Sequence, residues 1–223
     1  MNDRYLIIDT SHRGGFIALA RGETVLGTRP FAETRRQARD LAPSARLLMA
    51  EHGWHARDLA AVFVSLGPGS YTGLRVGLMS AKTLAYATGC TLLGVDTFAA
   101  CARQVPMQDR PVDVITDAQQ EKLYVRRFYG DDSGKLEIKS VTAWLETLPP
   151  NCWVTGPGLE LYSNRLPAGT RQAPPETRLP SPQSVLALGL ERLVRGERDD
   201  PFALEPIYLR PSAAEEKLLT VRI

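Results

Sequence analysis

Residues 113–128 read DVITDAQQEKLYVRRF, and they have the same layout as residues 5–20, which read YLIIDTSHRGGFIALA. Each stretch is an apolar strand that ends in an aspartate, followed by a short polar hairpin and a second strand. Aligning the two stretches places Asp117 on Asp9. A unit that recurs in both halves of a chain indicates an internal duplication. We therefore predict an α/β protein of two lobes, residues 1–104 and 105–223, in which the final helix and tail are able to pack back on the first lobe.

The segments between and after these units alternate between strand and helix patterns. Gly53 and Gly89 are placed to end two of the helices, Asp96 is placed to cap a third, and Pro43 is tolerable only in a first helical turn. We expect helices over 38–51, 73–89, 97–105 and 183–195. We expect further strands over 60–66, 91–95 and 206–210, and an extended loop over 166–183.

The composition is that of an ordinary globular protein. The chain has 223 residues, 43% of them apolar, and a formal net charge of +2, which is too small to imply tight, independent binding to nucleic acid. Its three cysteines have no C-x-x-C spacing, which favours reduced thiols in a cytoplasmic protein. The N-terminal apolar run is too short for a signal peptide or a membrane span.

The stretch GPGSYTGLRVG, residues 67–77, follows a buried strand and precedes a helix. It fits neither G-x-x-x-x-G-K-[ST] nor G-x-G-x-x-G, so a nucleotide phosphate loop is disfavoured. Ser70 lies in G-S-Y-T-G rather than in the G-x-S-x-G of a nucleophile elbow, which disfavours a peptidase. We expect a structural role: a tight turn and close helix packing that use the glycines, with Ser70 or Thr72 capping the helix. The residues of this motif are Gly67, Gly69, Ser70, Thr72, Gly73 and Arg75.

Two lobes that each open with a strand, an aspartate, a hairpin and a strand follow the plan of the actin, hexokinase and Hsp70 ATPase fold. The sequence also resembles one family in particular, through IIDTS, LGPGSYTGLRVG, VDTFAA, DAQQEKLYVRRF, TGPG at 155–158 and PIYLR at 206–210. With these motifs, nearly the whole chain is similar to the bacterial TsaB family, also called YeaZ. The resemblance implies a two-lobed actin-like (ASKHA) fold with duplicated mixed β-sheets.

The resemblance also implies a role in making threonylcarbamoyladenosine on tRNA. In that family the protein is regarded as a noncatalytic scaffold that pairs with the catalytic subunit TsaD, and the pair recruits the ATPase TsaE. We accordingly expect a cytoplasmic protein that meets tRNA indirectly through the complex and forms a homodimer in isolation. The catalytic TsaD relatives carry a histidine pair on the first helix, whereas the matching residues 36–48 here contain no histidine.

The nucleotide cleft of this fold is expected to be degenerate. The first lobe keeps Asp9, Ser11 and Gly14, which could still contact a nucleotide, although a strand-end Asp9 that caps its hairpin explains the same residues. In the second lobe Asp117 is followed by AQQEK, which has no glycine to let a polyphosphate approach the main chain. We therefore predict no catalytic residue, no cofactor and no metal site. A weak nucleotide-binding protein or ATPase, or less readily a peptidase, is the alternative.

The two helices of the first lobe are candidates for the partner surface. The apolar positions Leu41, Ala45, Leu48, Leu74, Leu78, Ala81 and Ala85 form helical stripes that include small residues. We predict that these stripes contact TsaD, or a second copy when TsaD is missing. The competing interpretation is that they face the protein's own sheet.

Overall fold

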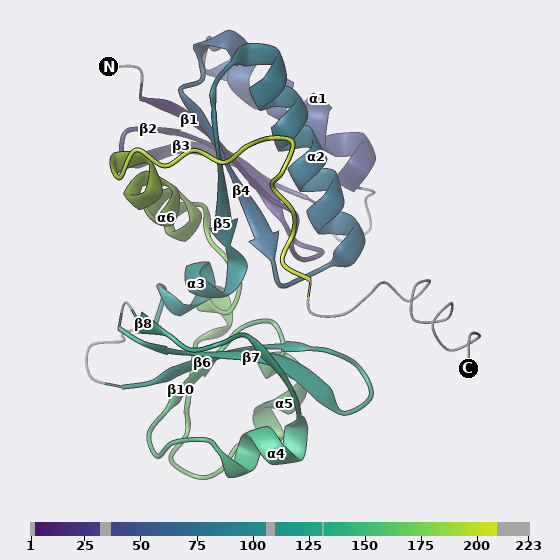
Figure 1. Ribbon diagram of the computed structural model, residues 1–223, viewed down its shortest axis with the longest axis vertical. Helices are drawn as coiled ribbons and strands as arrows, with labels where there is room; N and C mark the ends of the chain where they lie inside the picture. Colours follow the sequence, from purple (N-terminus) through teal and green to yellow (C-terminus); the bar gives the residue numbers. More distant parts are fainter. Residues whose placement is uncertain (1–2, 32–36, 106–109, 131, 209–223) are drawn as a thin grey trace, which may run out of the picture.

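The computed structural model describes residues 3–31, 37–105, 110–130 and 132–208. It has two lobes, each built on its own mixed β-sheet, stacked one above the other with α3 between them (Figure 1). The first sheet has the order β3-β2-β1-β4-β5, and in the second the order is β11-β10-β6-β7-β8, with β9 also paired to β7. In both sheets an antiparallel hairpin is extended by parallel strands, as the repeated sequence unit predicts.

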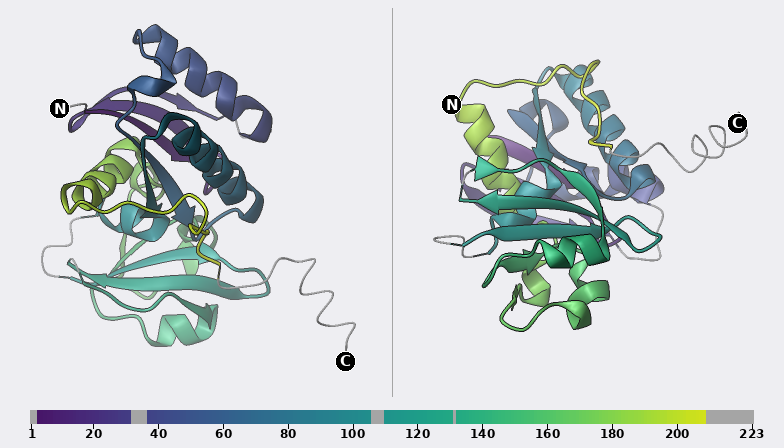
Figure 2. Two further views of the ribbon diagram at one scale, coloured as in Figure 1. Left: turned by 45° about the horizontal axis from the view of Figure 1, so that its top comes forward. Right: turned by 60° about the horizontal axis from the view of Figure 1, so that its bottom comes forward.

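The strands of the first sheet are β1 (Arg4–Asp9), β2 (Phe16–Arg21), β3 (Thr24–Pro30), β4 (Ala61–Gly67) and β5 (Thr91–Asp96). The helices α1 (Gln37–Glu51) and α2 (Tyr71–Thr88) cover one of its faces, and α3 (Thr97–Ala102) and α6 (Pro182–Val194) cover the other (Figure 2). Alternation along β1 produces this arrangement, because Leu6 and Ile8 pack toward α1 and α2 while Tyr5 and Ile7 pack toward α6.

The second sheet follows the same logic on a smaller scale. Its strands are β6 (Val112–Asp117), β7 (Lys122–Tyr129), β8 (Asp132–Ser133), β9 (Glu137–Ser140), β10 (Trp153–Thr155) and β11 (Arg171–Gln172). The short helices α4 (Val141–Glu146) and α5 (Leu159–Tyr162) pack on one face around the buried Trp144. The other face packs on α3 through Phe98 and Cys101, so α3 joins the cores of the two lobes.

The helix ends agree with the local sequence signals. Gly53 and Gly89 have left-handed φ values of 67° and 73°, and the carboxylate of Asp96 accepts hydrogen bonds from the first turn of α3. Two expectations are wrong. Pro43 lies in the second turn of α1, where its exposed position makes the lost hydrogen bond tolerable, and residues 206–208 form no strand although Ile207 N donates to Leu66 O at 2.8 Å.

Some expectations have no test in the described chain. The lobe boundary at residue 104 lies between the two sheets and stays a prediction. Residues 209 and 210 of the expected last strand lie outside the described residues. No helix in the described ranges is long and apolar enough to cross a membrane.

Candidate functional site

The glycine-rich loop after β4 packs directly on the hairpin that follows β1. Ser70 N donates to Ser11 O at 2.7 Å, and a Cβ added to Gly69 would lie 2.3 Å from that same carbonyl oxygen. Gly67 has a φ of 103°, in the region where side chains are strained. The loop then starts α2, where the Ser70 hydroxyl accepts from Gly73 N at 3.2 Å and Thr72 is exposed on the first turn.

Asp9, at the end of β1, is completely buried. Its Oδ1 accepts from Ser11 N at 2.9 Å, and its Oδ2 lies 3.2 Å from Nδ1 of His12. Burial alone would raise the pKa of Asp9, but the close contact with His12 and the hydrogen bond from Ser11 outweigh burial and hold the pKa below that of an ordinary aspartate. The carboxylate is therefore a charged, internal group of the hairpin, as in the capping interpretation.

The same neighbours do not form a catalytic triad. Ser11 Oγ lies 3.3 Å from Nδ1 of His12, the ring nitrogen that also faces Asp9. A serine triad needs the hydroxyl on one ring nitrogen and the carboxylate on the other. Ser11 is also buried, and Ser70 Oγ is used to cap α2. These contacts do not support peptidase chemistry.

The first hairpin offers little surface to a nucleotide in this conformation. Of the three residues predicted to retain nucleotide contacts, Asp9 and Ser11 are buried and Gly14 is partly exposed. Helix α2 closes the site from another side, because a Cβ on Gly77 would lie 2.1 Å from the hydroxyl of Thr10. Among the described residues, no group of three or more His, Cys, Asp or Glu side chains is arranged to hold a metal ion.

The hairpin of the second lobe is unusual in its backbone. Three successive residues without the freedom of glycine, Gln119, Gln120 and Glu121, have φ values of 63°, 55° and 56°. A left-handed conformation costs roughly 1–2 kcal/mol for each such residue. Tyr162 donates to Asp117 at 2.8 Å, and burial together with this carboxylate raises the pKa of Tyr162 to about 12. The hairpin therefore reaches its left-handed backbone without any glycine at residues 119–121.

The predicted partner surface is wrong for the side chains that carried it. All seven are buried in the first lobe: Leu41, Ala45, Leu48, Leu74, Leu78, Ala81 and Ala85. The reason is that a helix covering a sheet must use its apolar stripe for that purpose, and α1 and α2 both lie on the first sheet. The outward sides of the two helices instead expose Leu47, Met79 and Tyr86, with exposed fractions of 51%, 59% and 75%.

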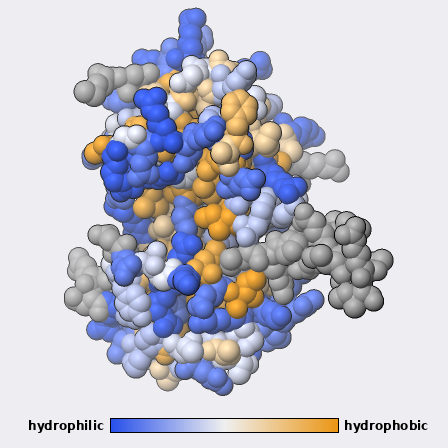
Figure 3. Space-filling view, viewed as in Figure 1, coloured by the Kyte–Doolittle hydropathy of each residue, from blue (hydrophilic) through white to orange (hydrophobic). Residues whose placement is uncertain are grey.

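The tail after α6 crosses β5, where Asp199 N donates to Leu92 O, and then runs beside α2 (Figure 1). The ring of Phe202 meets Tyr86 edge-on with centroids 5.9 Å apart, and Tyr208 packs on Tyr71 at 4.8 Å. Arg75 fixes this end, because its guanidinium lies 4.1 Å from the Tyr71 ring centroid and its Nε donates to the Tyr208 hydroxyl at 3.0 Å. In Figure 3, hydrophobic side chains coloured orange lie among blue ones over α2 and the tail.

Comparison with known proteins connects this geometry to a family. The family model described as "TsaD: tRNA N6-adenosine threonylcarbamoyltransferase" matches residues 22–143, which is more than half of the chain. The chain is 28% identical over 225 residues to the tRNA threonylcarbamoyladenosine biosynthesis protein TsaB of Bacillus subtilis (strain 168), covering 95% of this chain and 96% of the relative. It is 25% identical to the protein of the same name from Escherichia coli (strain K12), covering 96% and 98%. The chain belongs to the TsaB (YeaZ) family.

Solved structures agree on the fold of this TsaB-family chain. YeaZ from Pseudomonas aeruginosa superposes with a TM-score of 0.76 at 23% identity, over 93% of this chain and all of the other. The activator of the 2-hydroxyisocaproyl-CoA dehydratase from Clostridium difficile, solved with bound ADPNP, has a TM-score of 0.50 at 9% identity, over 87% of this chain and 97% of the other. The predicted actin-like, two-lobed α/β fold is confirmed.

The exposed side chains on α1 and α2 are the part of the site that the sequence analysis missed. Leu47, Met79 and Tyr86 are apolar or aromatic residues that fall off the helical stripe. That displacement is the signal that could have identified them. In an amphipathic helix, large apolar side chains outside the stripe do not pack into the core that the helix covers.

Proposed function

We propose that this TsaB-family protein is a noncatalytic scaffold in the synthesis of threonylcarbamoyladenosine on tRNA. In this role it pairs with the catalytic subunit TsaD in the cytoplasm, and the pair recruits the ATPase TsaE. The observation that carries the proposal is the closed first hairpin. Asp9 is fully buried in a hairpin on which the 67–70 loop packs at Ser11 and α2 packs at Thr10, so its carboxylate is not available as a ligand for the Mg²⁺ of a nucleotide.

The names of the full-length relatives support the pathway, since the Bacillus subtilis and Escherichia coli proteins are both named for threonylcarbamoyladenosine biosynthesis. The hairpin at 119–121 supports the absence of catalysis, because none of its residues is a glycine that would let a polyphosphate approach the main chain. A protein with the fold of an ATPase and neither phosphate hairpin available is suited to docking.

The outward side of α1 and α2 is the surface we propose for TsaD, and for a second copy of this chain when TsaD is missing. Its exposed apolar residues are Leu47, Met79, Tyr86 and, from the tail, Phe202, which is 81% exposed. Aromatic side chains and methionine are enriched at protein interfaces, where their burial dominates the binding energy. The ring contact between Tyr86 and Phe202 holds two of these side chains together before any partner binds.

Reconstitution tests the scaffold role. TsaD and TsaE are combined with unmodified tRNA and the other reactants, with and without this protein, and the formation of threonylcarbamoyladenosine is followed over time. We expect modification only when this protein is present, and no modification by the protein alone. An unchanged rate after its omission would remove the scaffold assignment.

Interface variants test the surface separately. Met79→Asp and Tyr86→Asp place a charge in the proposed contact and should abolish co-purification with TsaD and self-association. Leu161→Asp is the matched control, because Leu161 is 64% exposed on α5 of the other lobe. Equal binding of TsaD by all three variants would refute this surface without refuting the scaffold role.

A further inference from the structure

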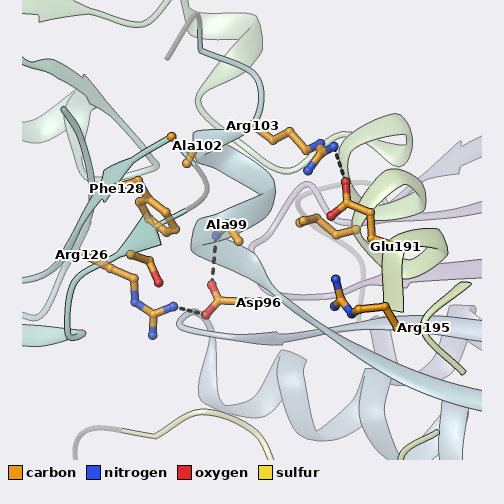
Figure 4. A pocket seen from close by; sticks show the side chains of 11 residues that line it. Asp96, Ala99, Ala102, Arg103, Arg126, Phe128, Glu191 and Arg195 are labelled. Carbon is orange, nitrogen blue, oxygen red and sulfur yellow. Dashed lines mark hydrogen bonds and ion pairs between the residues drawn. The ribbon is translucent and has the colours of Figure 1, made fainter. Parts of the chain in front are cut away.

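A cavity of 570 Å³ lies at the junction of the lobes, away from the Asp9 hairpin. Its walls come from α3, from the edge of the second sheet around β7 and from α6 (Figure 4). A volume between about 300 and 1,000 Å³ is typical of a site for a small organic molecule. Neither the scaffold role nor the partner surface uses this cavity.

Three arginines reach the cavity from three separate elements: Arg103 at the end of α3, Arg126 on β7 and Arg195 at the end of α6. Among the described residues that line it, the carboxylates are Asp96 and Glu191. Figure 4 shows Arg126 beside Asp96 at one wall, and Arg103 beside Glu191 at the other. Among the described lining residues, three arginines therefore stand against two carboxylates.

Arg126 is the arginine least well compensated. Its partner Asp96 also accepts hydrogen bonds from Phe98 N at 2.8 Å and Ala99 N at 3.0 Å, so the carboxylate is shared between the guanidinium and the start of α3. The Nε of Arg126 is buried and has no hydrogen-bond partner among the described residues. Native proteins rarely leave such a donor unsatisfied unless water, an ion or a ligand completes it.

The guanidinium of Arg195 can turn toward a ligand more easily than that of Arg126. It pairs at 2.6 Å with Glu197, which lies outside the cavity lining and is also bound by Arg192 at 2.7 Å. The side chain of Arg195 is 60% exposed. An exposed ion pair of this kind contributes little to stability, so a ligand can draw the arginine away at small cost.

The rest of the lining includes Ser133 together with the apolar side chains of Leu188 and Phe128, whose ring centroid lies 6.0 Å from the Arg126 guanidinium carbon. Guanidinium groups match the geometry of phosphate oxygens, and an apolar wall suits the base or sugar attached to a phosphate. We propose that this cavity binds a phosphate-bearing ligand of nucleotide size, with Arg126, Arg103 and Arg195 as its cationic contacts. The ligand is a free nucleotide or a nucleotide within RNA.

Binding to the isolated full-length chain tests the proposal and does not depend on TsaD. Calorimetry with AMP, adenosine and inorganic phosphate probes the free ligand, and fluorescence anisotropy with a labelled tRNA transcript probes the polymer. We expect AMP or the transcript to bind. Arg126→Gln should weaken that binding by about tenfold or more, the usual effect of losing a hydrogen bond to a charged group.

Two further variants keep the result interpretable. Arg195→Gln alters an exposed side chain, so it should weaken binding while leaving the thermal unfolding curve unchanged even if Arg126→Gln unfolds the protein. Arg57→Gln is the control, because Arg57 is exposed on the turn before β4, at the end of the sheet opposite Asp96. Its removal should change nothing.

The outcomes separate clearly. Loss of AMP binding in the cavity variants supports a free nucleotide, whereas loss of transcript binding with a smaller salt dependence supports RNA. Binding of adenosine as tight as that of AMP would overturn the role of the phosphate. Absence of binding for every probe at millimolar concentration, or an equal loss in Arg57→Gln, would overturn the site itself.

Discussion

Gly69→Ala should destabilise the protein severely, because the new methyl group would collide with main chain. Its Cβ would lie 2.3 Å from the carbonyl oxygen of Ser11, a distance that real Cβ atoms essentially never show. The neighbour is backbone and cannot rotate away, so the loop must move by about an ångström, at a typical overpacking cost of about 1–3 kcal/mol. That movement also strains the 2.7 Å hydrogen bond from Ser70 N to Ser11 O, worth about 1 kcal/mol.

The expected loss in the free energy of unfolding is therefore about 3 kcal/mol, or a decrease of roughly 6–12 °C in Tm for a chain of this length. Gly14→Ala is the matched control, on the hairpin that Gly69 contacts. The nearest atom to its added Cβ is His12 Cδ2 at 3.7 Å, an ordinary contact, and its φ is not in the left-handed range. Gly14→Ala should thus be neutral or slightly stabilising. Urea denaturation followed by circular dichroism measures both variants, and equal stability of the two would refute the packing argument.

Three further outcomes follow from buried groups. Asp113→Ala should cost about 3–5 kcal/mol in urea denaturation, because it leaves the Arg127 guanidinium and the Trp144 indole N–H without the carboxylate that both bind in the interior. Asp9 has a lowered pKa in the folded state. Its contribution to the free energy of unfolding is therefore complete above the unfolded pKa near 3.8 and is lost as the pH falls through the folded pKa. In Asp9→Asn, the free energy of unfolding should fall less steeply as the pH is lowered through this acid range. In the native protein only Cys90 should react with a thiol reagent such as DTNB, since the other two cysteines are completely buried.

An exposed aspartate and the unfolded protein serve as controls for these three outcomes. Asp132 is exposed on β8, so Asp132→Ala and Asp132→Asn should leave stability and its acid limb unchanged. Effects at Asp132 equal to those at Asp113 or Asp9 would contradict the role given to burial. All three cysteines should react after unfolding in urea, and rapid reaction of more than one thiol in the native state would contradict the packing around Cys101 and Cys152.

Much of the fold is determined by short-range patterns and is predictable from the sequence. The strand-aspartate-hairpin-strand unit indicates both sheets, because alternation and turn residues act over a few positions. Ser70 and Asp96 cap their helices, and Gly53 and Gly89 end theirs, for the same local reason. Pro43 departs from expectation because an exposed proline inside a long helix is held by the packing of the rest of that helix.

The candidate sites depended on tertiary structure. The same stripes that made α1 and α2 recognisable as helices are the ones they bury, and the surface proposed for a partner, with Leu47, Met79 and Tyr86, became visible only in the folded chain. The first hairpin is closed by the contact of Gly69 with Ser11, and the cavity is defined in part by the pairing of Arg126 with Asp96; both contacts join segments far apart in the sequence. Periodicity and turn chemistry are properties of neighbours in the chain, so the sequence alone determined which segments are helices and strands. Burial and the pairing of charges come from contacts between distant segments, and only the folded chain decided which side chains remain available to a partner or a ligand.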